Sequence, residues 1–192
     1  TLNGLLLIAS VSQITPISHK PNNHCLYSNW YKTCKTQNKP TGKPSTVSSP
    51  ELTNTIRTLI KQESLPDSYA DTVKKTILPL AQHLHSLKQA RNEPIVIGIH
   101  GAQGTGKSTL TLFLRELLTN HYRIPTASFS LDDLYLTRAE REQRANEIHP
   151  LFITRGVPGT HDLALGQHVV DQLKAAHRDT ETAIPAFDKS RD

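Results

Sequence analysis

Gly101-Ala102-Gln103-Gly104-Thr105-Gly106-Lys107-Ser108 fits the pattern G-x-x-x-x-G-K-S/T. The β-branched run Ile95-Val96-Ile97-Gly98-Ile99 precedes this stretch, and apolar residues at helical spacing follow it from Ser108 to Asn120. A strand, a glycine-rich loop and a helix in this order aim several backbone N–H groups and the positive end of the helix at one point. The sequence therefore predicts a phosphate-binding P-loop that follows a strand buried on both faces.

Each residue type in this motif has a chemical reason. The glycines keep bulky side chains away from phosphate oxygens, Lys107 reaches the β and γ phosphates of a nucleoside triphosphate, and the Ser108 hydroxyl is a ligand for Mg²⁺. A chance match would occur in a chain of this length with odds on the order of one in a hundred. We predict nucleotide contacts from Gly101, Ala102, Gln103, Gly104, Thr105, Gly106, Lys107, Ser108 and Thr109.

The charge of the chain is unevenly distributed. Residues 1–50 carry five of the 22 lysines and arginines and none of the 17 acidic residues, so residues 51–192 are neutral overall. The net charge of +5 therefore gives no reason to expect a nucleic-acid partner. No apolar stretch approaches the roughly 18 residues of a membrane-spanning helix, so we expect no membrane partner either.

The composition divides the chain at about residue 50. Residues 1–50 are rich in Ser, Thr, Asn, Lys and Pro, which is typical of a low-complexity, disordered extension. An organellar transit peptide is the alternative, although this segment has no arginine and no amphipathic pattern. Residues 51–192 are predicted to form an α/β domain. Its first part is helical, with one apolar face in residues 52–60 and another in residues 73–87, interrupted at Pro79.

An acidic pair follows the next predicted strand, residues 125–131. Asp132 and Asp133 lie at its carboxyl end, which faces the ligand crevice in open α/β sheets. One carboxylate there can accept the proton of an attacking hydroxyl, and a second can hold Mg²⁺ directly or through water. The alternative is that one of the two only caps the next turn.

Thr137 is expected to cap a helix over residues 138–147. The charged residues of this helix indicate a solvated face and no more; they are Glu140, Arg141, Glu142 and Arg144. The loop that follows, residues 149–162, is too rich in polar and conformationally special residues to be only a connection.

Two other classes of P-loop protein are disfavoured. A switch GTPase would carry an N-K-x-D motif that recognises the base, and Asn-Lys occurs once, at Asn38-Lys39, before Pro40. A motor ATPase would have a strongly apolar strand before its acidic pair, which Ala127-Ser128-Phe129-Ser130-Leu131 is not.

Four motifs, in this order, resemble the P-loop D-glycerate 3-kinases and their bacterial kinase relatives, within the wider phosphoribulokinase, uridine kinase and pantothenate kinase group. The motifs are residues 98–110, 130–136, 149–162 and 185–189. The resemblance covers residues 77–189. It implies a P-loop NTPase-type parallel sheet flanked by helices, with ATP and Mg²⁺ as cofactors. The P-loop and residues 155–162 are closer to the bacterial form, which favours a cytoplasmic protein; an organellar one is the alternative if residues 1–50 are a transit peptide.

The resemblance also implies roles for individual residues. Asp132 maps to the candidate base and acts with Lys107 in catalysis, while Asp133 and Ser108 would hold the metal. The acceptor side would be lined by Arg155, His161, Asp162, Phe187 and Lys189. Arg155 could bind a carboxylate through a two-pronged contact, although an arginine that only stabilises its loop is the alternative.

These observations lead to the hypothesis of an ATP-dependent kinase of a small hydroxy acid, with D-glycerate as the first candidate. The alternatives are a kinase of another small acceptor, such as a nucleoside or a pantothenate-like alcohol, and a non-catalytic ATP-binding module. Members of the family continue past the matched motifs into further strands, a nucleotide-base site and a lid. We therefore expect residues 51–192 to be the N-terminal part of a kinase domain, C-terminally truncated, which retains phosphate recognition; turnover by this part alone and the oligomeric state are left open.

Overall fold

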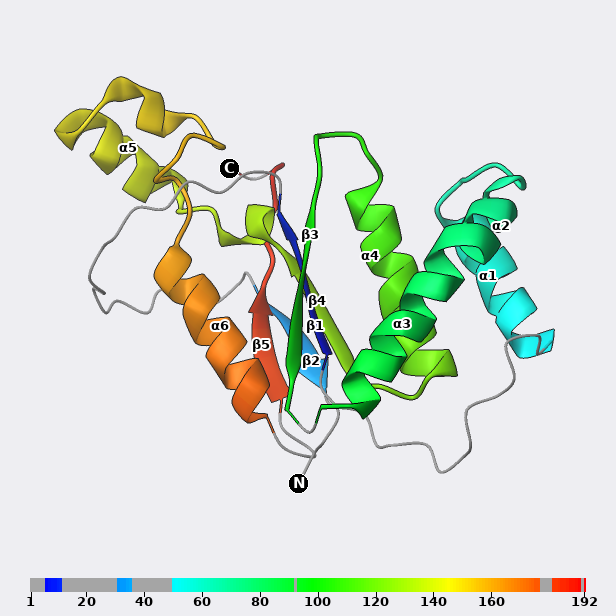
Figure 1. Cartoon of the computed structure of the whole chain (residues 1–192). Helices are drawn as coiled ribbons and strands as arrows, with labels where there is room; N and C mark the ends of the chain where they lie inside the picture. Colours follow the sequence, from blue (N-terminus) through cyan, green and yellow to red (C-terminus); the bar gives the residue numbers. More distant parts are fainter. Residues whose placement is uncertain (1–5, 12–30, 36–49, 92, 177–180, 191) are drawn as a thin grey trace.

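The computed structural model describes residues 6–11, 31–35, 50–91, 93–176, 181–190 and 192. The strands are β1 (Leu6–Val11), β2 (Tyr31–Lys35), β3 (Ile95–His100), β4 (Thr126–Ser130) and β5 (Glu181–Pro185). The α-helices are α1 (Pro50–Gln62), α2 (Tyr69–Thr72), α3 (Leu78–Gln89), α4 (Lys107–Glu116), α5 (Arg138–Glu147) and α6 (Leu163–Ala175). Two π-helical turns (Val73–Ile77 and Leu117–His121) and two 3₁₀ turns (Leu131–Leu134 and Pro150–Ile153) complete the order (Figure 1).

Three strands form a parallel sheet in the order β3-β1-β4. At the end of the sheet where its strands finish, His100 of β3 pairs with Val11, and Ser130 of β4 pairs with the adjacent Ser10. The carboxyl ends of β3 and β4 therefore lie at the same level, about 10 Å apart across β1. The predicted α/β class is confirmed. A second, two-stranded sheet pairs β2 antiparallel with β5.

Strands β1 and β2 lie in the segment for which the sequence predicts a disordered extension. At these two strands that prediction is at odds with the structure, because β1 is the central strand of the parallel sheet. Its sequence, Leu-Leu-Ile-Ala-Ser-Val, is the mostly apolar run expected of a central parallel strand, and the polar average over fifty residues conceals it. Apart from Pro50, with which α1 begins, the rest of residues 1–50 lies outside the described residues.

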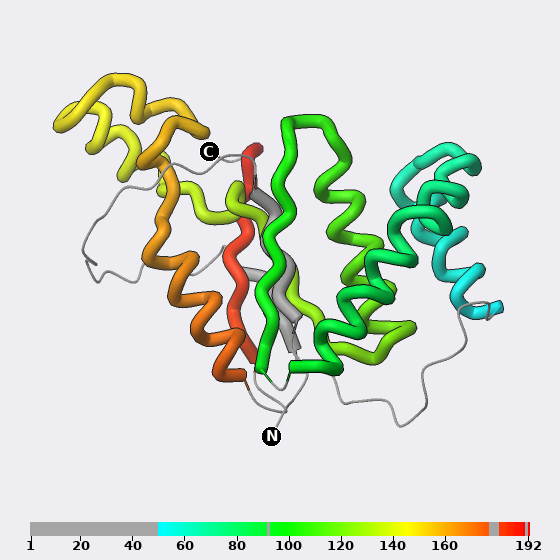
Figure 2. The backbone as a smooth tube through the Cα atoms, viewed as in Figure 1, coloured from blue at the N-terminus to red at the C-terminus, as the bar shows by residue number. Residues whose placement is uncertain are grey.

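Helices cover the strands on two sides (Figures 1 and 2): α3 and α4 on one, α6 on the other. The larger core joins α1, α3, α4 and one face of β3, and Phe113, Leu114, Leu117 and Leu118 at its centre have no exposed surface. The predicted apolar face of α1 is confirmed, since Leu52, Ile56, Leu59 and Ile60 are all buried there. The smaller core joins β4, β5 and α6 and consists of Ala127, Phe129, Leu134, Val169, Leu173 and Ile184.

Strand β3 is exposed on one face, contrary to the prediction that it is buried on both. Ile95, Ile97 and Ile99 pack against the larger core, whereas Val96 on the opposite face is 45% exposed. The larger core packs on the isoleucine face of β3, which is an edge strand of the three-stranded sheet, and the face that carries Val96 lies outside both described cores. A run rich in β-branched residues does not distinguish a strand covered on one face from a strand covered on both.

The predicted interruption at Pro79 is present as a π-helical turn. Residues Val73–Ile77 form this turn between α2 and α3, and Pro79 then lies in the first turn of α3. Proline is tolerated there because the first N–H groups of a helix have no partner within it. In the described parts of the chain, every helix is too short or too polar to cross a bilayer.

Candidate active site

The P-loop follows β3, and its backbone depends on two glycines. Gly104 and Gly106 have φ angles of +79° and +81°, in the left-handed region that side chains with a Cβ avoid. Gly106 precedes the first residue of α4. Gly101 is needed for a different reason, since a Cβ there would lie 2.9 Å from Oγ1 of Thr105. The loop therefore turns sharply into the helix and exposes backbone at the point where the helix begins.

The Lys107 ammonium group is held against this loop. Its Nζ donates hydrogen bonds to the carbonyl oxygens of Gly101 (2.8 Å) and Ala102 (2.7 Å), and Oγ1 of Thr105 donates to the Ala102 oxygen at 2.8 Å. Lys107 thus spans the loop and places its charge over it. Of the residues predicted to contact nucleotide, Ala102, Gln103, Gly104, Thr105, Gly106 and Ser108 are exposed, while Gly101, Lys107 and Thr109 are half-buried. This arrangement fits phosphate oxygens, because the N–H groups in the first turn of a helix lack partners within it.

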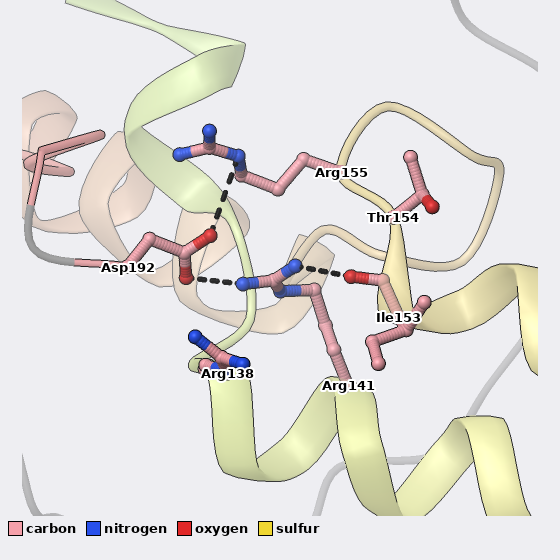
Figure 3. A pocket seen from close by; sticks show the side chains of 6 residues that line it. All are labelled: Arg138, Arg141, Ile153, Thr154, Arg155 and Asp192. Atoms are coloured by element: carbon pink, nitrogen blue, oxygen red, sulfur yellow. Dashed lines mark hydrogen bonds and ion pairs between the residues drawn. The ribbon is translucent and has the colours of Figure 1, made fainter.

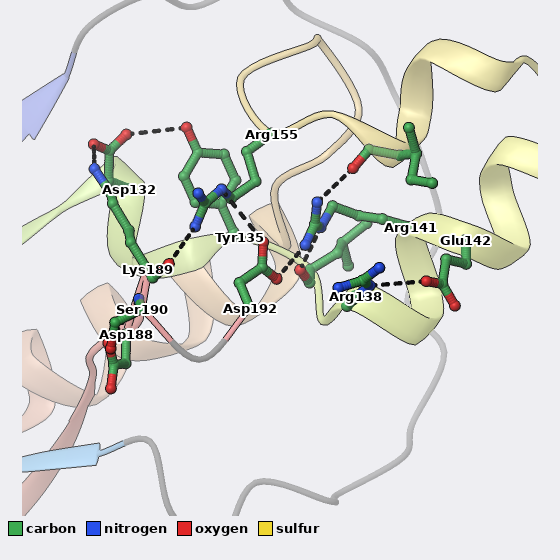
Figure 4. A network of polar contacts seen from close by, with 12 residues as sticks. Asp132, Tyr135, Arg138, Arg141, Glu142, Arg155, Asp188, Lys189, Ser190 and Asp192 are labelled. Carbon is green, nitrogen blue, oxygen red and sulfur yellow. Dashed lines mark hydrogen bonds and ion pairs between the residues drawn. The ribbon is translucent and has the colours of Figure 1, made fainter.

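Asp132 lies in the 3₁₀ turn that follows β4, at the same end of the sheet as the start of the P-loop. One of its oxygens accepts a hydrogen bond from the Tyr135 hydroxyl at 3.2 Å, and the other accepts one from Nζ of Lys189 at 2.7 Å (Figure 4). Two sequence-predicted site residues, Asp132 and Lys189, are therefore in direct contact although 57 positions separate them.

The pKa of Asp132 lies below its ordinary value. Partial burial by itself raises this pKa, but the hydrogen bond and charge of Lys189, with smaller contributions from Tyr135 and His161, outweigh the burial. Asp132 is consequently ionised at neutral pH, as a general base must be. Burial, together with the charge of Asp132, raises the pKa of Tyr135, so its hydroxyl keeps the proton that it donates.

Asp133 has a structural role in this arrangement. One of its oxygens accepts a hydrogen bond from the Ser130 N–H at 2.9 Å, which closes a capping box over the 3₁₀ turn, and the other accepts one from the Phe187 N–H at 3.2 Å. Asp133 thereby ties the end of β4 to the segment that follows β5. This corresponds to the alternative reading of the acidic pair, in which one carboxylate caps the next turn, rather than to the predicted metal ligand.

Aromatic rings surround the contact between Asp132 and Tyr135. The Tyr135 ring stacks on His161, with 4.4 Å between centroids, and meets the Phe187 ring edge-on at 5.3 Å. The Arg155 guanidinium lies over the Phe187 ring, 5.6 Å from its centroid. Burial lowers the pKa of His161, while the charge of Asp132 acts in the opposite direction, so His161 is neutral at pH 7. Four of the five predicted acceptor-side residues thus gather in one cluster: Arg155, His161, Phe187 and Lys189.

The fifth, Asp162, caps α6. Its carboxylate accepts a hydrogen bond from the Leu165 N–H at 2.9 Å, and its own N–H donates to the Leu134 oxygen at 2.7 Å. The bond to Leu134 and the β-bridge between Tyr135 and His161 dock the loop before α6 against the segment after β4. Asp162 therefore holds its neighbour His161 in place, and the structure gives it this capping role instead of a place in the cluster.

Arg141 is a site residue that the sequence analysis missed. The predicted solvated face of α5 is wrong at this position, because Arg141 is 3% exposed. With Arg138, Ile153, Thr154, Arg155 and Asp192 it lines a cavity of about 280 Å³ (Figure 3). The Thr137 cap of α5 is confirmed by reciprocal hydrogen bonds between Thr137 and Glu140. A signal was available in the sequence: α5 has almost no apolar residues, so a long polar side chain had to supply its attachment.

Comparison with known proteins gives three matches. The chain is 38% identical over 114 residues to the uncharacterized kinase mug58 of Schizosaccharomyces pombe, a match that covers 58% of this chain and 40% of that protein. It is 35% identical over 107 residues to the probable ATP-dependent kinase TDA10 of Saccharomyces cerevisiae, covering 51% and 36% of the two chains. It is also 35% identical over 101 residues to the chloroplastic D-glycerate 3-kinase of Arabidopsis thaliana, covering 50% and 22%. This chain is a relative of these kinases.

The predicted resemblance is confirmed at the level of this relationship. The matched part of the chain corresponds to 40% or less of the length of these kinases. No protein-family model matches the chain, and no solved structure matches it.

The described residues fit Mg²⁺ at one predicted ligand. Ser108 is exposed in the first turn of α4, where its hydroxyl can meet a cation bound to phosphate oxygens. Mg²⁺ commonly keeps several waters and takes only one or two protein ligands beside substrate phosphates, so a dedicated cage is not required. No group of three or more His, Cys, Asp or Glu side chains able to hold a metal occurs among the residues that the structure describes.

Proposed function

We propose that this chain carries the phosphoryl-transfer centre of an ATP-dependent kinase of a small hydroxy acid, with D-glycerate as the first acceptor to test. The observation that carries the proposal is the position of Asp132. This ionised carboxylate follows β4 at the same end of the sheet at which the P-loop follows β3. Tyr135, Lys189 and His161 surround it. The three kinase relatives support the reaction class, and the one named D-glycerate 3-kinase supports the choice of acceptor.

The proposed chemistry is a direct transfer. Asp132 accepts the proton of the acceptor hydroxyl while that oxygen bonds to the γ-phosphorus of ATP, and the bond from that phosphorus to the bridging oxygen breaks to release ADP. Lys107 and the backbone of residues 101–109 would hold the phosphates. Mg²⁺ at Ser108 would neutralise phosphate charge.

Lys189 has to change partners during this cycle. Its ammonium group now occupies one oxygen of Asp132, but its side chain is 58% exposed and can move without disturbing a core. The negative charge that develops on the transferred phosphoryl group offers a second partner for Lys189. We therefore infer that Lys189 leaves Asp132 as the base begins to accept the proton.

The surroundings of Asp132 favour a short acceptor with a carboxylate. Tyr135, His161 and Phe187 present ring surfaces, and Arg155 provides a guanidinium group held over one of these rings. A planar guanidinium can bind a carboxylate through two parallel hydrogen bonds. An acceptor of this kind would place a hydroxyl near Asp132 and its acid group near Arg155.

The test is ADP release by the intact protein, measured with D-glycerate, L-glycerate, other hydroxy acids, nucleosides and pantothenate as acceptors. The expected result is ADP release that depends on D-glycerate, with the phosphate ester identified by ³¹P NMR and turnover strongly reduced in Lys107→Ala. Turnover with a nucleoside or pantothenate alone would identify a kinase of another small acceptor. Equal ADP release with and without every acceptor would overturn the kinase proposal in favour of an ATP-binding module that hydrolyses its ligand.

A further inference from the structure

Asp192 bridges two arginines that come from different parts of the fold. One carboxylate oxygen of Asp192 accepts a hydrogen bond from Nη2 of Arg141, and the other pairs with Nε of Arg155 at 3.3 Å (Figures 3 and 4). The Asp192 side chain is 11% exposed, so water screens these contacts only weakly. This bridge is separate from the contact between Asp132 and Lys189.

Arg141 is the fixed end of the bridge. Its Nε donates a hydrogen bond to the Leu136 oxygen at 3.2 Å, and its Nη1 donates to the Ile153 oxygen at 2.6 Å. These two carbonyls come from the segment before α5 and from the loop that carries Arg155, so they fix the plane of the guanidinium. A planar group with three directed bonds has little freedom to reorient. Arg141 therefore presents Nη2 to Asp192 in a defined direction.

Arg155 is held on three sides as a result. Nε faces Asp192, Nη1 donates a hydrogen bond to the Lys189 oxygen at 3.4 Å, and the Phe187 ring lies against the guanidinium. Among the described residues, the hydrogen bond and ion pair of Arg155 use Nη1 and Nε and leave Nη2 for a ligand. Because Asp192 occupies the Nε side, the end formed by Nη1 and Nη2 is the one that can receive a carboxylate in a two-pronged contact.

The charge balance of the cluster also favours an anion. Asp192 supplies one negative charge to the two guanidinium groups of Arg141 and Arg155. One positive charge thus remains without a full counter-charge beside the cavity of about 280 Å³. A second carboxylate, brought by the acceptor, would complete the pairing.

We propose that Asp192 and Arg141 are positioning residues that orient Arg155 toward the acceptor and thereby set the affinity for acceptors that carry a carboxylate. This inference rests on the proposed kinase function and adds two residues to it. Neither residue touches the reacting atoms. Both act through the guanidinium of Arg155.

The first experiment measures steady-state kinetics of the intact protein with Asp192→Asn, Asp192→Glu and Glu142→Gln. Asparagine keeps the shape of residue 192 but removes the charge that fixes Nε of Arg155. We expect Asp192→Asn to raise KM for the acceptor about tenfold or more while KM for ATP changes less than about twofold. Asp192→Glu should restore part of the loss. Glu142→Gln is the matched control, because it breaks an exposed ion pair on α5, the helix of Arg141, and should leave kcat and both KM values unchanged.

The second experiment does not depend on turnover. The Nε–H signal of Arg155 in a ¹⁵N NMR spectrum, assigned by its loss in Arg155→Lys, should be protected from solvent exchange in the wild type and in Glu142→Gln. In Asp192→Asn the signal should shift and exchange faster. If no acceptor supports turnover but this signal still follows Asp192, the kinase proposal fails and the positioning contact stands. An unchanged signal in Asp192→Asn, an unchanged acceptor KM, or an equal rise of both KM values with a lower melting temperature would each overturn the inference.

Discussion

The phosphate side and the acceptor side of this site are constructed in different ways. The P-loop is one continuous stretch, and its backbone groups form most of the predicted phosphate site. The Lys107 side chain bonds to carbonyl oxygens only five or six residues earlier in the chain. The acceptor side is assembled from side chains after β4, in the loop before α6 and after β5. A continuous loop can be identified from a short pattern, whereas an assembled cluster depends on how distant segments pack. The phosphate side therefore tolerates few backbone changes, and the acceptor side depends on individual charges.

Lys107→Ala is the strongest test of the phosphate side. The substitution removes the charge that would meet the β and γ phosphates and also the two hydrogen bonds that span the loop. We expect kcat/KM for ATP to fall on the order of 10³-fold. Lys174→Ala, at an exposed position in the last turn of α6, is the control. Normal ATP affinity and turnover in Lys107→Ala would show that the phosphates bind elsewhere.

Asp132→Asn tests the acceptor side without touching the P-loop. The amide keeps the shape of the carboxylate but cannot accept the proton, so kcat should fall about 10²-fold or more while ATP affinity stays close to normal. Isothermal titration with ATP and single-turnover kinetics separate the two effects. A loss of ATP affinity as large as the loss in kcat would mean that the two sides are not separable.

Lys189→Ala sharpens the comparison through pH. In the free enzyme Lys189 holds the pKa of Asp132 below its ordinary value against the effect of burial, so the ionised base persists as pH falls. Without Lys189, the main contribution that opposes burial is lost and only Tyr135 and His161 still lower this pKa, so the proton returns to Asp132 at a higher pH. The acid limb of the kcat/KM profile should therefore move to higher pH in Lys189→Ala. An acid limb at the wild-type position would show that another group controls it.

Asp133→Asn should affect stability more than chemistry. The asparagine side chain has one acceptor oxygen, so it cannot accept hydrogen bonds from both Ser130 and Phe187 as Asp133 does. We expect a loss of about 1–2 kcal/mol in the free energy of unfolding, measured by chemical denaturation. Added Mg²⁺ should not restore activity. Recovery at high Mg²⁺ would return Asp133 to the role of metal ligand that the sequence first predicted.

Features that depend on neighbouring residues could be predicted from the sequence. The spacing of apolar residues indicated the face of α1, the glycines indicated the P-loop, and the pattern at Thr137 indicated a helix cap. The position of Asp132 at a strand end also follows from local pattern. Each of these features is determined by residues that lie close together in the sequence.

Features that depend on distant segments could not be predicted in this way. For Asp133 the sequence left a metal ligand and a turn cap as alternatives, and Asp162 was placed on the acceptor side by resemblance. A carboxylate that caps a turn and one that binds a ligand cannot be distinguished by local sequence. The burial of Arg141 depends on Asp192 and on the Ile153 carbonyl, both far along the chain. The exposed face of β3 depends on which elements pack on the sheet. No local pattern contains that information.

The segment after β5 is fastened to the rest of the site by contacts that span more than fifty residues: Phe187 to Asp133, Lys189 to Asp132, and Asp192 to Arg141. Each of these contacts closes a long loop, which lowers the entropy of the chain before the contact can stabilise it. The bonds within the P-loop close loops of only three to six residues, so they lower the entropy less. The order of assembly follows from this difference. The loop that holds phosphates can form early and locally, but the base at Asp132 acquires its partners only when the last described strand has docked. The amide protons of residues 186–190 should accordingly exchange with solvent faster than those of α4. The first partial unfolding of this protein would then disable the acceptor side and leave the phosphate side intact.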